Sequence, residues 1–380
     1  MSISSTALAQ NIALPVEFYL QQLPVNYSME VKQAANVHHD EDAPVRFGKV
    51  WEKLPYQPLV QSLQAHKKQY ELSDWMYFLL IRKASEQLFP GRSDNYRTMA
   101  QWFLLTKSGY RVKLLCNNQR AYIFVHTANM AFELPYIETK EGRFVNITGH
   151  FDKSAQKLSR LSDAEMLYNV RGRSFDFSVN ELPKILSANP IEKTLSFRHD
   201  KQTYELTVKG DKTVISYLRN YPKLELNAWA RVPLSDVAYN SFIPAFRQLI
   251  EGKSQQDAVR MILSFTRNAF VYETDQNAYQ EDNLIFSPEM TLLSPYSDCE
   301  DRAILFAYMV KELLGLKTVL VEYPTHVSAA VNLPTIIGKP VIFGGEAYTF
   351  CEPTGPQDHL TLGEYPVKFA NSAYNVIPTE

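Results

Sequence analysis

One helix-length segment constrains the fold of this chain more than any other feature. From Ala303 to Val310 the side chains are apolar nearly all round, and charged residues occur only near the two ends of the segment 299–314. A helix that is apolar on every side lies inside a protein core, because none of its faces suits water. Gly315 follows directly, and glycine readily adopts the left-handed conformation that ends helices. The sequence therefore predicts a core helix over 299–314, with other elements packed around it.

Composition sets the size of the core and excludes two classes of function. The chain has 380 residues, 45% of them hydrophobic, which is enough for two or three folded domains. Its 39 basic and 41 acidic side chains give a formal net charge of -2, without a dense lysine or arginine block. We therefore expect no nucleic-acid binding. No apolar run reaches the roughly 20 residues that cross a bilayer, so we expect no membrane span.

The chain divides into four stretches of different texture. Helical patterns over 73–89 and 95–109 precede short strand-like runs, which together indicate an α/β domain. The next stretch alternates from Gln202 to Val208 and contains Lys-Gly-Asp-Lys, which predicts a hairpin with its turn at that tetrapeptide. After Pro233 the pattern becomes helical again. We therefore expect an α+β protein with an N-terminal tail, an α/β domain, a β-rich hairpin segment and a C-terminal domain, over 1–25, 26–185, 186–239 and 240–380, respectively.

Cys299 is expected to be the first residue of the core helix. The chain has three cysteines, Cys116, Cys299 and Cys351, too few and too scattered for a disulfide framework or a closed zinc site. At a helix start, free backbone N–H groups and the helix dipole favour a thiolate and can donate to an oxyanion. The neighbouring acidic residues oppose thiolate formation by like-charge repulsion. Taken alone, Cys299 could equally be an ordinary buried thiol.

A histidine and a carboxylate follow the cysteine along the chain. His326 opens the strand-like run after Pro324, and Glu352 ends the aromatic run that begins at Ala347. A histidine can act as general base for a cysteine, and a carboxylate can orient that imidazole and stabilise its charged form. Each of these residues alone is more often structural. Their order after Cys299, on successive predicted strands, favours a catalytic triad.

This arrangement resembles the transglutaminase-like superfamily over about residues 240–360. The phrases that carry the resemblance are Ser297-Asp298-Cys299-Glu300-Asp301, Thr325-His326-Val327 and Tyr348-Thr349-Phe350-Cys351-Glu352-Pro353-Thr354. The resemblance implies a buried helix against an antiparallel sheet, with Cys299 as nucleophile, His326 as general base and Glu352 as the residue that orients it. Glu352 stands where the family usually has aspartate. Its extra methylene requires a shift of about 1.5 Å in the strand end or the imidazole.

The resemblance further implies a cysteine-dependent hydrolase or acyl transferase that acts on amide or peptide bonds. Its substrate would be a protein, a peptide or a peptidoglycan-like polymer, and we favour hydrolysis by a protease or amidase over crosslinking. An oxyanion donor is implied upstream of the cysteine, for which Tyr296 or another residue of 283–296 is the candidate. No cofactor and no metal are expected.

The N-terminal domain repeats part of this pattern. Ser93-Asp94-Asn95 and the helix after it echo Ser297-Asp298-Cys299 and the core helix, and each helix has another helix upstream and strands downstream. Asn95 then takes the place of the nucleophile, and an amide cannot perform that chemistry. Two interpretations stay open: an inactive copy of a transglutaminase-like core, or an unrelated helix–glycine–strand unit.

Other functions and two compartments also stay open. The scaffold could be a non-catalytic binding or assembly module, and Cys299 with Cys351 could form a redox pair, although no Cys-x-x-Cys motif supports it. Ala7-Leu8-Ala9 has the small-x-small character of a signal-peptidase site, without the basic and apolar regions that should precede it. We therefore expect the protein to be either exported, to a periplasmic or extracellular location, or cytoplasmic. The sequence indicates no oligomeric state.

Overall fold

The computed structural model describes residues 11–40, 42–117, 119–152, 162–163, 171–184, 189–355 and 360–379. The protein is 38% helical and 26% strand, which agrees with the predicted α+β class. It forms two compact units, Met1–Ser178 with Pro183–Leu186 and Val179–Leu182 with Ser187–Glu380. The segment 186–239 therefore belongs almost entirely to the second unit. Ala7-Leu8-Ala9, the predicted export signal, lies outside the described residues.

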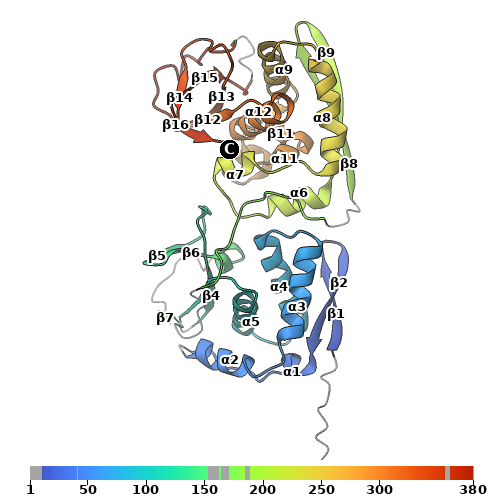
Figure 1. Cartoon of the computed structure of the whole chain (residues 1–380), viewed down its shortest axis with the longest axis vertical. Coiled ribbons are helices and arrows are strands. Elements are labelled where there is room, and N and C mark those ends of the chain that lie inside the picture. Colours follow the sequence, from blue (N-terminus) through green and yellow to red (C-terminus); the bar gives the residue numbers. More distant parts are fainter. Residues whose placement is uncertain are drawn as a thin grey trace, which may run out of the picture. The chain divides into compact units, whose positions relative to one another are not determined.

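The first unit, coloured blue to green in Figure 1, begins with a hairpin and ends with a sheet. Its described elements are β1 (Asn11–Phe18), β2 (Gln21–Ser28), α1 (Met29–Lys32), α2 (Ala43–Trp51), α3 (Gln57–Gln69), α4 (Asp74–Leu88), α5 (Asp94–Lys107), β3 (Val112–Cys116), β4 (Ala121–His126), β5 (Tyr136–Thr139), β6 (Gly142–Asn146), the 3-10 helix η1 (Ile147–His150) and β7 (Ser162–Asp163). Residues 11–25, which the sequence analysis assigned to a tail, form most of the β1–β2 hairpin instead.

The second unit, yellow-green to red in Figure 1, follows the same plan, and its described elements include two added short helices and two added short strands. Its described elements are β8 (Pro190–His199), β9 (Gln202–Asp211), α6 (Lys212–Arg219), α7 (Leu226–Ala230), α8 (Asp236–Ile250), α9 (Gln255–Asn268), β10 (Val271–Tyr272), α10 (Asp275–Tyr279), α11 (Pro288–Leu293), β11 (Tyr296–Ser297), α12 (Cys299–Leu314), β12 (Thr318–Tyr323), β13 (His326–Val331), β14 (Val341–Phe343), β15 (Glu346–Cys351) and β16 (Asn375–Pro378).

Local signals place the ends of the main helices. The hydroxyl groups of Ser73, Ser93 and Ser254 each accept a hydrogen bond from the backbone N–H three residues later, so these serines cap α4, α5 and α9. Gly109 and Gly315 adopt positive φ angles of 91° and 64° just after α5 and α12, the conformation in which glycine commonly ends a helix, and the prediction for Gly315 is thereby confirmed.

The predicted hairpin exists, but its turn was predicted in the wrong place. Strands β8 and β9 are joined at Asp200-Lys201, whose φ angles are 47° and 68°. A two-residue turn with both residues in the left-handed region matches the twist of the flanking strands, and aspartate tolerates that region. The Lys-Gly-Asp-Lys tetrapeptide lies at the other end of β9. There the Asp211 side chain accepts a hydrogen bond from the Thr213 N–H and caps α6.

Each unit contains a five-stranded antiparallel sheet with the same strand order. In the first unit the order is β5-β6-β4-β3-β7, and in the second it is β14-β15-β13-β12-β16. The registers also agree, because the fourth residue of β4, Phe124, faces the last residue of β6, and the fourth residue of β13, Ala329, faces the last residue of β15. The strand after the helix, its hairpin partner and the later strands therefore occupy matching places in the two sheets.

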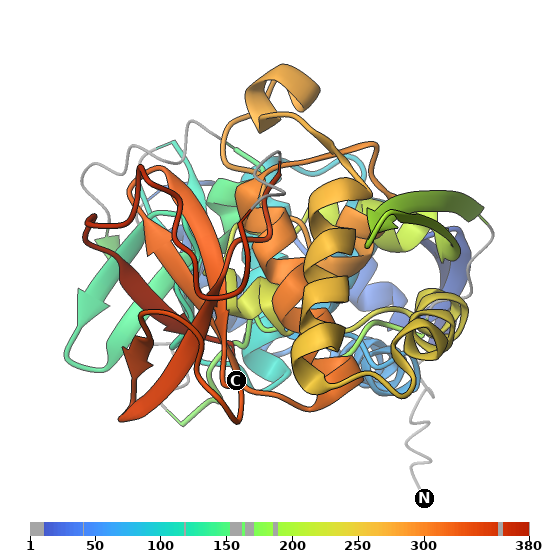
Figure 2. The same ribbon diagram turned by 90° about the horizontal axis from the view of Figure 1, so that it is seen from above.

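The layers that cover the two sheets also match. In the second unit α12 packs on β12 and β13 and is covered on its other side by α9, and α8 and α9 contact the β8–β9 hairpin (Figures 1 and 2). In the first unit α5 packs on β3 and β4 and is covered by α4, and α3 and α4 contact the β1–β2 hairpin. Each unit is thus a hairpin, a helix layer, a central helix and a sheet.

The predicted core helix is confirmed. Every residue of α12 from Ala303 to Val310 is buried, and Leu305, Phe306 and Met309 belong to a core shared with α8, α9 and the β8–β9 hairpin. Because α12 is buried along its length, its first residue is held at a fixed place beside the sheet. No helix in the described parts of the chain is both long and apolar enough to cross a bilayer.

Candidate active site

The start of the buried helix carries the predicted nucleophile. Cys299 is the first residue of α12 and is half-buried. Two hydrogen bonds fix the chain around it: the Asp301 carboxylate accepts from the Phe286 N–H at 2.8 Å, and the Arg302 guanidinium donates to the Ser297 hydroxyl at 3.0 Å. These contacts tie the first turn of α12 to the segments before it. The helix start is therefore a rigid support for the thiol.

The predicted histidine and carboxylate are in direct contact. His326 is the first residue of β13, and its Nε2 lies 2.9 Å from Oε2 of Glu352, the residue that follows β15. β13 and β15 are neighbours in the sheet, which is why residues 26 positions apart meet. Glu352 is buried and also accepts hydrogen bonds from the Ser328 hydroxyl at 2.7 Å and the Thr354 N–H at 2.9 Å. The carboxylate is thus held in place before any substrate binds.

The thiol lies at the same edge of the sheet as the histidine. The backbone N–H of Val327, the residue next to His326, interacts with the Cys299 sulfur and favours its charged form. Because Nε2 of His326 faces Glu352, Nδ1 is the ring nitrogen left for a proton from the thiol. Among the described residues, no hydrogen bond occupies that Nδ1. The structure therefore brings His326 and Glu352 into contact and places Cys299 beside Val327, the residue that follows the histidine.

The acidic neighbours keep the thiol neutral. The Cys299 Sγ donates a hydrogen bond to Oε2 of Glu300 at 2.9 Å. Burial raises the pKa of the Cys299 thiol well above its usual value, and the Glu300 and Asp298 carboxylates raise it further. The helix dipole and the Val327 N–H oppose this shift and are outweighed by it. In this arrangement Cys299 is a thiol, and a base must remove its proton before it can attack.

Three carboxylates beside the cysteine form a group that could hold a divalent cation. Asp275, Asp298 and Glu300 each offer an oxygen within 4.8 Å of the others. Burial and the neighbouring carboxylates raise the pKa of Asp298 to about 10, and burial together with Glu300 raises the pKa of Asp275 to about 6. Carboxylate oxygens suit hard cations such as Ca²⁺ or Mg²⁺. The sequence analysis expected no metal, and it missed this group because Asp275 lies on a separate helix.

Four further residues shape the site without having been singled out from the sequence. Buried Arg302 donates to the backbone carbonyls of Arg267 and Phe270, and Arg267 donates to the backbone carbonyl of Glu352 at 2.7 Å. Both arginines thus link α9, α12 and the end of β15. The ring of Phe369 stacks on that of His326, with centroids 4.9 Å apart and planes 3° apart. These roles depend on contacts between distant segments, so the local pattern gave no signal for them.

Tyr272 is the fourth of these residues, and the charge of a Cys299 thiolate would affect the pKa of its phenol. Burial raises the pKa of the Tyr272 phenol to about 12, and Cys299, Asp298 and Glu300 contribute to the rise. Tyr296, the predicted oxyanion donor, pairs through its backbone with Val271. No hydrogen bond joins the Tyr296 side chain to Cys299 within the part of the chain that the structure describes.

The proposed redox pair finds no support in the geometry. Cys116, Cys299 and Cys351 are all free thiols. Cys351 is fully buried in the sheet, where its register partner is Ala329 and its Sγ lies 3.6 Å from the Thr349 carbonyl oxygen. Burial raises the pKa of Cys351 to about 12, so this thiol is unreactive near neutral pH.

Comparisons of the chain with models of protein families, with curated proteins and with solved structures found no match. The chemical capacity of the site therefore has to follow from its own residues. A thiol at a helix start, an imidazole with one free nitrogen and a buried carboxylate that fixes the other nitrogen are the parts of a nucleophile–base–acid triad.

Proposed function

We propose that the second unit is a transglutaminase-like cysteine enzyme that acts on amide or peptide bonds. The observation that carries this proposal is the contact between His326 and the buried Glu352, which orients the imidazole at the edge of the sheet where Cys299 lies. A glutamate in place of the usual aspartate is accommodated here, because Ser328 and Thr354 supply donors to the longer side chain. The buried α12 and the antiparallel sheet also agree with that kind of core.

The chemistry would proceed through an acyl-enzyme. Nδ1 of His326 takes the proton from the Cys299 thiol, and the sulfur forms a bond to the substrate carbonyl carbon. Backbone N–H groups at the start of α12 stabilise the negative oxygen of the tetrahedral intermediate. His326 then gives its proton to the leaving amine as the C–N bond breaks. Water, or a second amine, attacks the thioester with His326 as general base, and the thiol is restored.

The surface beside the cysteine suits an extended substrate with apolar side chains. Val271, Tyr272 and Tyr296 lie on the short parallel pair β10–β11 and are exposed at 61%, 45% and 37%. Large exposed apolar side chains that cluster next to a catalytic group commonly contact substrate. We therefore favour a protein or peptide substrate, hydrolysed by water, over a crosslinking reaction. A peptidoglycan-like polymer, which also carries amide bonds, is the other substrate to test.

Alkylation by iodoacetamide near neutral pH tests the triad directly. The rate is measured on the full chain, with Cys299→Ala as the blank for the two buried cysteines. We expect His326→Gln to slow alkylation of Cys299 at least about tenfold, because the base that removes its proton is lost. His199→Gln is the matched control, since His199 belongs to the same unit and bonds to Ser264. It should leave the rate unchanged.

A trapping experiment then tests the reaction itself. Unfolded casein serves as substrate, and hydroxylamine serves as an amine that converts an acyl-enzyme to a hydroxamate. We expect peptide release and hydroxamate formation by the wild type, and neither by Cys299→Ala or His326→Gln. If Cys299 reacts no faster than a small free thiol and His326→Gln has no effect on it, the catalytic proposal is wrong.

The second candidate function is a non-catalytic binding or assembly module. The hydrogen bond from the Cys299 thiol to Glu300 favours it, because a proton held between these groups makes the sulfur a poor nucleophile. In that case the Cys–His–Glu contact would only stabilise the edge of the sheet. The module would be supported if His326→Gln lowers the melting temperature but leaves the rate of alkylation of Cys299 unchanged.

A further inference from the structure

The first unit has a cavity at the place that corresponds to the candidate active site. The cavity measures about 480 Å³ and is lined by the first residues of α5 and β4 and by Thr148, which follows β6. In the second unit, the first residues of α12 and β13 and the residue after β15 are Cys299, His326 and Glu352. Because the two sheets share strand order and register, the strand positions correspond; the counterpart of Glu352 is Ile147, and Thr148 lies one residue beyond it.

At the described positions that match Cys299, His326 and Glu352, the first unit has Asp94, Ala121 and Ile147, so it has neither a thiol nor an imidazole there. Asn95 is the second residue of α5. The Asn95 amide donates to the Gln119 carbonyl oxygen at 2.8 Å and accepts from the Ala121 N–H at 3.1 Å. Asn95 therefore joins the start of the helix to the start of the strand. The described lining of the cavity contains no cysteine and no histidine.

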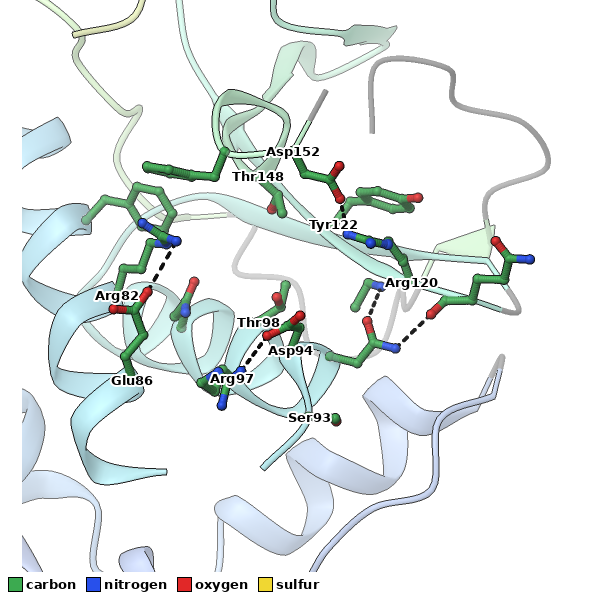
Figure 3. A pocket seen from close by; sticks show the side chains of 16 residues that line it. Arg82, Glu86, Ser93, Asp94, Arg97, Thr98, Arg120, Tyr122, Thr148 and Asp152 are labelled. Atoms are coloured by element: carbon green, nitrogen blue, oxygen red, sulfur yellow. Dashed lines mark hydrogen bonds and ion pairs between the residues drawn. The ribbon is translucent and has the colours of Figure 1, made fainter. Parts of the chain in front are cut away.

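The charged groups of the cavity are already paired with one another (Figure 3). Arg82 pairs with Glu86 at 3.2 Å, Arg97 with Asp94, and Arg120 with Asp152. Among the described lining residues, three arginines balance three carboxylates, so this part of the lining has no net charge. A phosphate or another free anion would have to break an existing pair to bind. The cavity therefore suits a ligand that is uncharged overall.

Two polar side chains of α5 face the cavity with no partner of their own. Thr98 and Gln101 are only 9% and 7% exposed, and neither side chain makes a hydrogen bond among the described residues. Their polar atoms stay accessible from the cavity, so a bound ligand can exchange hydrogen bonds with them in place of water. A hydroxyl and a carboxamide each donate and accept. Their natural partner is a group that alternates N–H and C=O, as a peptide backbone does.

The aromatic walls argue against a sugar ligand. Sugars bind largely by stacking on an accessible aromatic face. Cζ of Arg82 lies 3.9 Å from the centroid of the Phe151 ring. That ring also stacks against Trp75, and the angle between the two ring planes is 1°. Phe78 and Tyr122 are 1% and 6% exposed. Among the described lining rings, only Phe151 is substantially exposed, at 39%, and the Arg82 guanidinium lies over its ring, whereas the amide and hydroxyl groups remain available.

We propose that this cavity is a binding site for a segment of polypeptide, which it holds without cleaving. Its volume falls in the range of ligand sites in proteins, and its lining is neutral and polar. The first unit would then be a peptide-binding counterpart of the second, built on the same order of elements. The proposal does not depend on whether Cys299 is catalytic, because none of its residues belongs to the second unit.

Affinity selection with peptides tests this site in the full chain. Cys299→Ala is used as the parent, so that no peptide is cleaved, and the probe is a tryptic digest of dephosphorylated casein. Retained peptides are identified by mass spectrometry after rapid gel filtration. We expect a subset to be retained, and we expect Gln101→Met to weaken their retention about tenfold, since the amide that pairs with them is lost. Gln61→Met on the exposed side of α3 is the matched control and should leave retention unchanged.

Three outcomes would overturn the proposal. The first is a parent chain that retains no peptide. The second is retention that Gln101→Met and Thr98→Val both leave unchanged, because the peptides would then bind another surface. The third is retention of chitohexaose or of inorganic phosphate, with none of the peptides. Melting temperatures of both variants close to that of the parent would show that a loss of binding is not a loss of folding.

Discussion

Replacing Glu300 by glutamine should make Cys299 more acidic, and the structure sets the size of the effect. The Cys299 Sγ and Glu300 Oε2 lie 2.9 Å apart, so a thiolate would face a carboxylate at hydrogen-bond distance. Two like charges at that distance repel by about 1.4 kcal/mol at a dielectric constant of 80 and about 6 kcal/mol at 20. This range corresponds to about 1 to 4 pH units in the thiol pKa. Because both side chains are half-buried, we expect the low end, a fall of about 1 to 2 units.

The assay is the rate of alkylation of Cys299 by iodoacetamide as a function of pH. A thiol reacts as its thiolate, so a lower pKa moves the rise of the rate to lower pH. Glu300→Gln should therefore react faster than the wild type near neutral pH, with Cys299→Ala as the blank. Glu251→Gln, an exposed acid at the end of α8, is the matched control and should follow the wild-type profile. An unchanged or higher midpoint in Glu300→Gln would refute the assignment of Glu300 as the group that keeps the thiol neutral.

Three more predictions concern the same site. Glu352→Ala leaves His326, Ser328 and the Thr354 N–H without an acceptor, so it should destabilise the second unit by about 2–5 kcal/mol. Thermal unfolding measures this loss. As the control, Glu346→Ala breaks an exposed ion pair with Lys317 and should cost less than about 1 kcal/mol. Burial raises the pKa of Asp275 from 3.8 to about 6, so between these pH values the folded state binds a proton that the unfolded state has lost. The wild type therefore loses stability as the pH rises from 3.8 to about 6. Over that range the melting temperature of Asp275→Asn should rise relative to that of the wild type, and the melting temperature of the exposed control Asp282→Asn should not. A divalent cation among Asp275, Asp298 and Glu300 would neutralise the charges that oppose the thiolate. Added calcium should therefore speed the alkylation of Cys299 in the wild type more than in Glu300→Gln. Equal alkylation rates with calcium and with a chelator would count against such a site.

The elements that the sequence predicted well are those specified by local signals. The core helix over 299–314 and the glycine at 315 depend on side chains within one or two turns. The hairpin turn was predicted at the tetrapeptide that contains Gly210, because glycine is the stronger local turn signal. Asp200 and Lys201 form the turn instead, and their left-handed conformation is selected only by the register of the two strands. The hairpin at 11–28 was missed because β1 and β2 are half exposed, and the helices that cover them lie much later in the chain.

The site shows the same division between local and distant information. Cys299, His326 and Glu352 could be found because each sits at the end of an element, where a short phrase marks it. Arg267, Arg302 and Phe369 could not, because their partners are backbone carbonyls or a ring supplied by another segment. Their roles appear only once α9, α12 and the sheet are in contact.

The state of the thiol follows from a balance of charges around one helix start. The macrodipole supplies about half a positive charge there, and buried Arg302 adds a full one, although its contacts go to carbonyls and a hydroxyl. Against them stand Asp275, Asp298, Glu300 and Asp301, and burial raises the pKa of Asp298 and Asp301, so part of this negative charge is removed by protonation. Of the remaining carboxylates, Glu300 is the one that accepts a hydrogen bond from the thiol. For the proposed enzyme, Cys299 can become a nucleophile once that excess is offset, and a substrate cation or a metal ion held by the same carboxylates would offset it.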